Sequence, residues 1–345
     1  MKSVLVGISG GVDSSVCALI LKEKGYNVIG STMCLFDDAN LDNAKKACDI
    51  LGIEHKVIDY KKEFKNEIIN YFVNEYNNSR TPNPCVMCNK KLKFGLLYDY
   101  AKSLGIDYIA TGHYAKIEYS DKYNRYVLKK SKNLDKDQSY FLYGIRKEIL
   151  GNILFPLEDF DSKDEVRKIA RDNNLNTASL SDSEDICFIP DGNYKRFLEN
   201  NNYVKTSIGN VVLNNEVIGK HDGLYKYTIG QRKGLDIAYS EPLYVVGFNK
   251  DKNELLVGIE SDLYTNSFKV KDYNLLLIDN IKEKMLVSVK TRYRSKEVDA
   301  YIEEKDGYIQ VDFLKPQKGV TPGQSAVFYL DDTVLGGGII EWRRL

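Results

Sequence analysis

The sequence predicts an α/β Rossmann-like N-terminal domain followed by a small central β-rich domain and a C-terminal β-barrel. Short apolar runs alternate with amphipathic helical stretches over about the first 200 residues, and beyond them short runs rich in Val, Ile and Tyr alternate with turns. A chain of 345 residues is also longer than one compact core usually supports. We expect domains at 1–200, 201–264 and 265–345.

The N-terminal elements follow one another as strand and helix. Strands are expected at 4–6, from 28, at 56–59 and at 108–110, with helices at 13–24, 41–51, 62–77 and 90–104. Strands separated by helices imply a parallel sheet covered on both faces. A hairpin is expected at 116–130, followed by two helical stretches, the second opening with Ser162 and Glu165 at capping-box spacing.

The remaining chain reads as strands separated by turns. Turn signals such as Asn214-Asn215 and Asp306-Gly307 interrupt its apolar runs. This pattern favours a small β-rich domain followed by a barrel or a sandwich, of which we expect the barrel.

Composition narrows the class of protein. Hydrophobic residues make up 43% and charged residues 28%, as in globular proteins, and the net charge of zero leaves nucleic-acid binding to local basic patches. We find no signal-peptide pattern and no apolar run of membrane-spanning length, so we expect a cytoplasmic protein with no membrane partner. Six cysteines are too few for a disulfide scaffold.

A glycine-rich segment follows the first strand and opens a helix. Residues 9–14 read Ser-Gly-Gly-Val-Asp-Ser. Two glycines let the backbone approach an anion, while free N–H groups and the helix dipole attract it. The segment lacks the lysine of a Walker motif, which disfavours a kinase or GTPase. The alternative is a tight turn capped by Asp13 or Ser14.

Three cysteines stand outside any packing pattern. Cys85 and Cys88 lie in Thr-Pro-Asn-Pro-Cys-Val-Met-Cys-Asn (81–89), which we expect to be a loop before a helix whose start carries Lys90, Lys91 and Lys93. Ammonium groups and a helix N-terminus both favour thiolate over thiol, and Cys88 is the better placed. The third, Cys187, is expected in a loop between helices. The other three, Cys17, Cys34 and Cys48, fit buried positions.

These motifs carry a resemblance. The 9–14 segment resembles the loop of the PP-loop ATP pyrophosphatases, of the adenine nucleotide alpha hydrolase-like fold. The whole series resembles the bacterial tRNA-uridine 2-sulfurtransferases, or tRNA-specific 2-thiouridylases. The matching segments span the chain in order: 7–15, 81–84 with 88–89, 110–115, 137–142, 183–189, 219–221, 227–235, 292–294 and 321–324.

The resemblance implies ATP as co-substrate, with Mg²⁺. ATP would adenylate the C2 oxygen of the wobble uridine of tRNA and release pyrophosphate, and Asp13 would have a magnesium-assisted catalytic role. The implied ATP-binding residues are Gly7, Ile8, Ser9, Gly10, Gly11, Val12, Asp13, Ser14, Ser15, Met33 and Gly112.

The resemblance also implies how sulfur is carried. Cys187 would accept sulfur as a persulfide from an upstream cysteine desulfurase or sulfur-relay donor, and Cys88 would be the nucleophile that pairs with it as AMP is displaced. The implied tRNA-facing residues are Asn83, Pro84, Cys85, His113, Asp137, Gln138, Ser139, Arg292, Tyr293, Arg294 and Gln324. Taken alone, Arg292 and Arg294 also fit a solvated strand face, and His113 a hydrogen-bonded structural residue.

One departure leaves the sulfur chemistry open. Many members of the family carry Asp where this chain has Cys85. Cys85, Cys88 and Cys187 could therefore hold an iron–sulfur cluster that carries hydrosulfide, or less readily a zinc ion. Two other functions compete: a PP-loop synthetase that adenylates a small substrate, which gives Cys88 and Cys187 no use, and a zinc-containing RNA-binding protein, which leaves the 9–14 segment unexplained.

Overall fold

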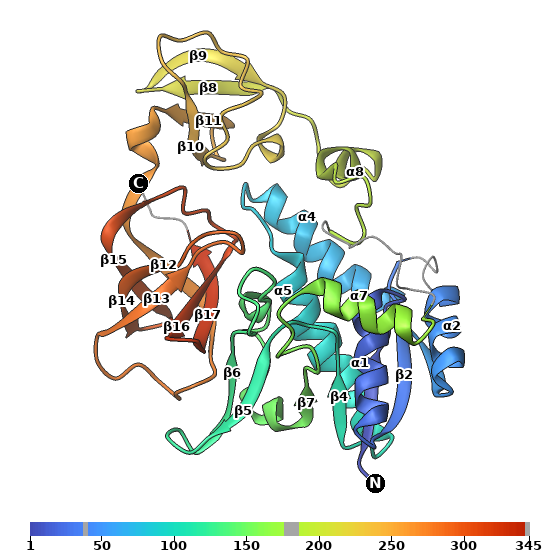
Figure 1. Cartoon of the computed structure of the whole chain (residues 1–345). Coiled ribbons are helices and arrows are strands. Elements are labelled where there is room, and N and C mark those ends of the chain that lie inside the picture. The colour runs from blue at the N-terminus through green and yellow to red at the C-terminus, as the bar shows by residue number, and fades with distance from the viewer. Residues whose placement is uncertain (37–40, 176–185, 342–345) are drawn as a thin grey trace.

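A five-stranded parallel sheet forms the centre of the N-terminal domain (Figure 1). The computed structural model describes residues 1–36, 41–175 and 186–341. The sheet has the order β3-β2-β1-β4-β7. Its strands are β1 (Ser3–Gly7), β2 (Asn27–Cys34), β3 (Glu54–Asp59), β4 (Tyr108–Ala110) and β7 (Ile153–Leu154). The expected Rossmann-like sheet is confirmed.

Alternate residues of β1 pack into the two helical layers. Val4 and Val6 share one core with α1 (Val12–Glu23), α2 (Leu41–Leu51) and α7 (Lys163–Asp172), whereas Leu5 packs against the opposite layer. That layer contains α5 (Pro84–Cys88), η2 (Asn89–Leu96) and α6 (Leu97–Ser103), which run on as one helix with a π-helical middle. A second continuous helix comprises α3 (Lys61–Phe64), the π-helical η1 (Lys65–Ile69) and α4 (Asn70–Asn77).

The strand order places the ligand-binding edge of this sheet. β1 pairs with β2 on one side and with β4 on the other, so the order reverses between β1 and β4. In open parallel sheets ligands bind at the carboxyl ends of the strands beside such a reversal. The 9–14 loop follows β1, and Thr111 and Gly112 follow β4.

The expected hairpin forms but joins another sheet. β5 (Lys116–Ser120) and β6 (Arg125–Lys129) pair with each other, and β6 pairs with β17 (Thr333–Glu341) of the C-terminal domain. The first of the two expected helical stretches is only a pair of 3₁₀ turns, η3 (Ser139–Phe141) and η4 (Lys147–Asn152). The second stretch is α7, and the side chain of Ser162 accepts from the backbone of Glu165 as its spacing predicts.

The β-rich half comprises a small sheet and a closed barrel, as expected. The four-stranded sheet has the order β10-β11-β8-β9 and its own apolar core. Six barrel strands run in the order β12-β15-β14-β13-β16-β17, and pairing of β12 with β17 closes the ring. None of the described helices is long and apolar enough to cross a membrane.

The remaining elements complete these two domains and the connection to them. They are α8 (Tyr194–Asn200), β8 (Gly209–Leu213), β9 (Glu216–His221), η5 (Leu224–Lys226), β10 (Tyr244–Asn249), β11 (Glu254–Gly258), η6 (Glu260–Leu263), β12 (Tyr264–Leu275), β13 (Met285–Lys290), β14 (Val298–Lys305), β15 (Tyr308–Lys318) and β16 (Ser325–Leu330).

Candidate functional site

Hydroxyl groups hold the glycine-rich loop after β1. The Ser14 hydroxyl accepts from the Ser9 backbone at 3.2 Å, and the Ser14 and Ser15 hydroxyls each donate to the Gly11 carbonyl at 3.0 Å. Gly10 has φ +79°, a left-handed conformation that favours glycine. Gly11 is the N-cap of α1 and has no side chain to cap it, whereas Ser14 bonds to the turn from within the helix, as the alternative of a capped turn also expects. The geometry suits an anion at the helix N-terminus.

Two side chains distant in sequence hold Asp13. The Tyr114 hydroxyl donates to Oδ1 and the Lys163 ammonium to Oδ2, both at 3.0 Å. Tyr114 lies in a motif that the sequence marks, but no local pattern connects Lys163 with Asp13. Neither contact has a local sequence signal, because the packing of α7 beside α1 creates the one from Lys163 and the approach of the chain after β4 creates the one from Tyr114.

The residues after β4 pack directly onto this loop. A Cβ on Gly112 would lie 2.8 Å from the Asp13 carbonyl carbon and 2.9 Å from the Ser14 nitrogen, so glycine is required there. His113 is only 9% exposed, its Nδ1 lies 2.7 Å from the Thr111 hydroxyl, and burial lowers its pKa well below the usual value. The bonded structural interpretation of His113 fits this placement better than direct contact with RNA.

The end of β2 closes another side of the loop. The Ile8 backbone N–H donates to the Ser31 carbonyl at 2.7 Å, and the Thr32 hydroxyl donates to the Ile8 carbonyl at 2.8 Å. Met33 is the next residue. It is half-buried and packs against the core that contains Leu5 and Leu97. Its proposed adenine contact stays a prediction.

Cys85 and Cys88 lie on a helix, and the expectation of a loop before the helix is wrong. Helix α5 begins at Pro84, and its N-cap is Asn83, whose Oδ1 accepts from the Val86 backbone at 3.4 Å. Proline is favoured at the first helical position because its missing N–H would have no partner there, and Asn is a strong N-cap. Both thiols therefore project from the first turns of one rigid element.

An aromatic cluster next to Cys187 holds it near Cys85 and Cys88. The Phe188 ring centroid lies 5.6 Å from that of Phe64 and 5.3 Å from that of Phe72. Cys88 and Ile186 pack against this cluster too. Although the Cys187 side chain reaches the surface, desolvation by its neighbours, with the nearby Cys88 and Cys85 sulfurs, raises its pKa to about 12. The 183–185 part of the expected 183–189 motif lies outside the described residues.

Of Lys90, Lys91 and Lys93, it is Lys93 that lowers the pKa of the thiols. Desolvation by neighbouring side chains raises the pKa of Cys88, and of Cys85 although that side chain reaches the surface, by more than Lys93 lowers it. The net direction is opposite to the expected stabilisation of thiolate. The Lys90 side chain packs against Gly144, and the Lys91 ammonium pairs with Glu67 at 3.5 Å. All three thiols are free, and Cys17, Cys34 and Cys48 are buried as expected.

The three thiols do not form a metal-ligand set as placed. Across 1–36, 41–175 and 186–341, no group of three or more His, Cys, Asp or Glu side chains is arranged to hold a metal ion. The donor geometry therefore fits neither a three-cysteine cluster nor zinc.

Several residues expected to face RNA instead bond within the protein. Asp137 is buried and accepts from the Ser131 backbone at 3.0 Å and from the Ser139 hydroxyl at 2.6 Å. Gln138 Oε1 accepts from the Tyr114 backbone at 3.0 Å. These contacts fix the segment that follows the hairpin, and the buried Asp137 and Ser139 side chains do not reach the surface.

Among the barrel residues expected to face tRNA, some bond within the protein and others are exposed. Residues 292–294 form a turn, so the solvated-strand interpretation is wrong. The Arg292 guanidinium donates to the Gly319 carbonyl at 2.6 Å and to the Thr321 hydroxyl, whereas Arg294 is exposed. The Tyr293 ring packs 4.4 Å from that of Phe141. Gln324 bonds to the segment that precedes Cys85, as described below.

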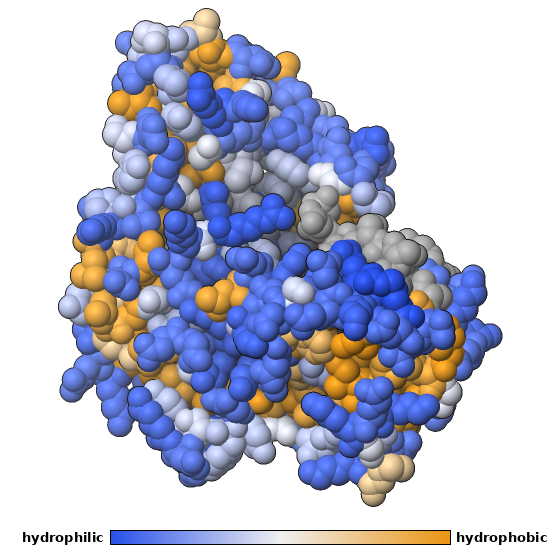
Figure 2. Space-filling model, viewed as in Figure 1, coloured by the Kyte–Doolittle hydropathy of each residue, from blue (hydrophilic) through white to orange (hydrophobic). Residues whose placement is uncertain are grey.

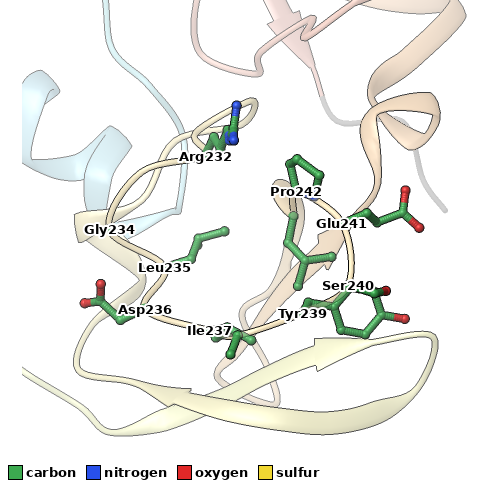
Figure 3. A pocket seen from close by; sticks show the side chains of 11 residues that line it. Arg232, Gly234, Leu235, Asp236, Ile237, Tyr239, Ser240, Glu241 and Pro242 are labelled. Carbon is green, nitrogen blue, oxygen red and sulfur yellow. The ribbon is translucent and has the colours of Figure 1, made fainter.

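The larger cavity lies away from the phosphate loop. It is an open hollow of about 510 Å³ lined by a single loop of the central domain, with Leu235 and Pro242 on facing sides (Figure 3). A smaller cavity of about 230 Å³ lies beside Phe188 and α8. Hydrophilic residues cover most of the face in Figure 2, over the central domain as well as the N-terminal one. Neither cavity contains a sequence-predicted ATP residue.

Comparison with known proteins matches the whole chain. Residues 2–191 match the family profile described as "tRNA methyl transferase HUP domain", 195–259 the "PRC-barrel domain" of the same series, and 265–340 the "Aminomethyltransferase beta-barrel domain". The chain is 45% identical to the "tRNA-specific 2-thiouridylase MnmA" of Acetivibrio thermocellus, with 99% of both chains covered. It is 44% identical to the protein of that name from Caldicellulosiruptor saccharolyticus, covering 99% of this chain and 98% of the other.

Among solved structures the similarity is distant. A predicted subunit of tRNA methyltransferase from Methanocaldococcus jannaschii is 22% identical, with 50% of this chain and 76% of that chain covered and a TM-score of 0.33. A likeness of that size adds nothing to the assignment, which rests on the full-length relatives.

Proposed function

The chain belongs to the tRNA-specific 2-thiouridylase family, and on that premise we propose that it adenylates the C2 oxygen of a tRNA wobble uridine and displaces AMP with sulfur carried by Cys187. It is a sulfurtransferase that acts on tRNA. The observation that carries the mechanism is the meeting of Cys88 and Cys187, which are distant in sequence, on one aromatic cluster.

The activation step uses the loop after β1. The uridine C2 oxygen attacks the α-phosphorus of ATP, the bond to the β-phosphate breaks, and pyrophosphate leaves. Gly10 and Gly11 open the helix N-terminus to the phosphates, and Gly112 allows the β4 end to approach the same loop. Mg²⁺ would supply charge neutralisation on the phosphates when bound, and Asp13, whose carboxylate here pairs with Lys163 and Tyr114, is the carboxylate on this loop that would hold it.

Transfer of sulfur from a Cys187 persulfide to the uridine needs no external oxidant, because the persulfide already carries sulfane sulfur. The terminal sulfur of a Cys187 persulfide attacks C2, the C2–O bond breaks and AMP leaves. The Cys88 thiolate then attacks the Cys187 sulfur, which forms the Cys88–Cys187 disulfide and leaves sulfur as the thiocarbonyl on the base. A thiol reductant must restore both cysteines before the next persulfide arrives. The partner is a cysteine desulfurase or relay protein that delivers sulfane sulfur to Cys187.

Some of the residues proposed to contact tRNA are exposed or half-buried. Cys85 at the start of α5 and Arg294 on the barrel are exposed, and Tyr293 is half-buried. We assign the wobble base to the neighbourhood of Asn83, Pro84 and Cys85, where it must leave its stack to reach the thiols. The division into domains at 1–200, 201–264 and 265–345 is part of the same proposal.

Purified protein with unmodified tRNA, ATP and a persulfide donor tests the proposal. We expect tRNA-dependent AMP and pyrophosphate, and 2-thiouridine by nucleoside mass spectrometry. Cys88→Ser and Cys187→Ser should each lower thiouridine by at least about a thousandfold while ATP binding persists, because the phosphate loop is a separate element. Cys48→Ala, a buried core cysteine, is the control.

The same experiment separates the rivals. Full thiolation by either serine variant would contradict the persulfide assignment. Iron and acid-labile sulfide in active, anaerobically purified protein would favour the cluster. AMP formation with a small substrate and no tRNA would indicate another synthetase, and bound zinc without turnover an RNA-binding protein.

A further inference from the structure

The segment before Cys85 has almost no structure of its own and is held by the barrel. The Thr81 backbone N–H donates to the Pro322 carbonyl at 2.9 Å. The Gln324 side-chain amide donates to the Thr81 carbonyl at 3.2 Å and to the Pro82 carbonyl at 3.0 Å. One turn of the C-terminal domain thus satisfies three backbone groups immediately upstream of helix α5.

That turn fits closely against the segment. Gly323 has φ +88°, and a Cβ there would lie 2.7 Å from the Thr81 carbonyl oxygen and 2.9 Å from its nitrogen, so no side chain can be accommodated. The turn is itself bonded to β17, because the Gly323 N–H donates to the Ile340 carbonyl and the Ile340 N–H to the Gln324 carbonyl, both at 2.9 Å. The support is therefore as rigid as the barrel wall.

An ion-pair bridge holds the same segment one residue earlier. Arg80 donates to Glu75 on α4 and to Glu341 on β17, both at 2.8 Å, and its side chain is only 15% exposed. Arg80 therefore joins the N-terminal domain to the barrel beside the start of α5. At the other end of the segment, Asn83 is buried and caps the helix.

We propose that Gln324 is a positioning residue for sulfur transfer: through Thr81 and Pro82 it holds the N-terminus of α5 so that Cys88 faces Cys187. The inference rests on the proposed role of these two cysteines. Because the Gln324 Nε2 donates to two backbone carbonyls, the donor side of the amide is engaged within the protein. Reacting thiols tolerate little displacement, so loosening the helix start slows transfer without weakening RNA or ATP binding.

The test compares Gln324→Ala with Gln317→Ala. Within the described residues the Gln317 amide bonds to Lys315 of its own strand and to no part of the segment, so this control removes a barrel glutamine without touching the segment. After oxidation with diamide, formation of the Cys88–Cys187 disulfide, followed by mass spectrometry, should be roughly ten- to a hundredfold slower in Gln324→Ala. The kcat should fall with it, whereas KM for tRNA and for ATP should not change.

A second variant and measurement cover a folding defect. Gln324→Glu keeps the size of the side chain but cannot donate, so it should behave like Gln324→Ala. In both, hydrogen exchange at the α5 amides should speed up while the barrel amides stay protected. A higher KM for tRNA with unchanged kcat, α5 exchange and disulfide rate would overturn the proposal. If wild-type protein forms no Cys88–Cys187 disulfide, the sulfur mechanism fails, and the exchange measurement still decides the role of Gln324.

Discussion

At the scale of single residues, Lys93 opposes the burial of Cys88. The thiol lies in an apolar cluster that raises its pKa, and Lys93 is the cation that lowers it. A cation stabilises the thiolate, so its removal raises the pKa further and leaves less thiolate at neutral pH. One pKa unit corresponds to tenfold in that fraction.

We therefore expect Lys93→Met to slow alkylation of Cys88 by iodoacetamide at pH 7 by about three- to tenfold, and to shift the rising limb of the rate against pH to higher pH. Tandem mass spectrometry distinguishes Cys88 from Cys85. Lys91→Met is the control, because Lys91 pairs with Glu67 instead. An unchanged pH profile in Lys93→Met would show that Lys93 does not act on this thiol.

At the scale of elements, the cap of α7 connects helix stability with the nucleotide loop. The Ser162 hydroxyl accepts from the Glu165 backbone and lies 3.3 Å from its carboxylate, and the next residue, Lys163, holds Asp13. Ser162→Ala should lower the free energy of unfolding by about 1 kcal/mol, measured from urea midpoints at constant slope. Ser240→Ala, at an exposed position, should leave it unchanged. Equal effects of the two substitutions would show that the cap contributes nothing.

Local sequence patterns predicted the regular elements well and their irregular parts poorly. Helix 41–51 and strand 108–110 form with the expected bounds, because apolar periodicity and burial agree there. The helix expected at 90–104 begins at Pro84, because proline fits the first helical position as well as it fits a loop. The π-helical turns of η1 and η2 have no sequence signal, because they depend on the packing of neighbouring helices.

At the candidate site, the motifs predicted which residues lie together. They predicted less well whether each side chain is exposed to a substrate or bonded within the protein. Cys85, Cys88 and Cys187 do lie together, but the aromatic cluster that brings them there joins segments far apart in sequence. His113 and Asp137 were expected at a surface and are buried. A motif marks a residue as constrained, and only tertiary structure distinguishes a group that touches substrate from one that positions another group.

At the scale of the whole molecule, the barrel and the N-terminal domain share one core. Leu276, Val327, Tyr329 and Val334 of the barrel belong to the same buried cluster as Leu142. The central domain instead has a separate core, which includes Leu255. No sequence pattern predicted this division, because the shared core depends on how the hairpin joins the barrel.

The two cores predict two patterns of local unfolding. Leu142 and Leu255 are both fully buried, so Leu→Ala at either should cost about 2–5 kcal/mol in the unit that contains it. Leu142→Ala should reduce hydrogen-exchange protection of the β-sheet amides in both the N-terminal domain and the barrel, because they unfold together. Leu255→Ala should reduce protection only in β8–β11. Loss of protection confined to the N-terminal domain in Leu142→Ala would show that the barrel unfolds independently, and the shared core would then not couple the cysteine helix to its support.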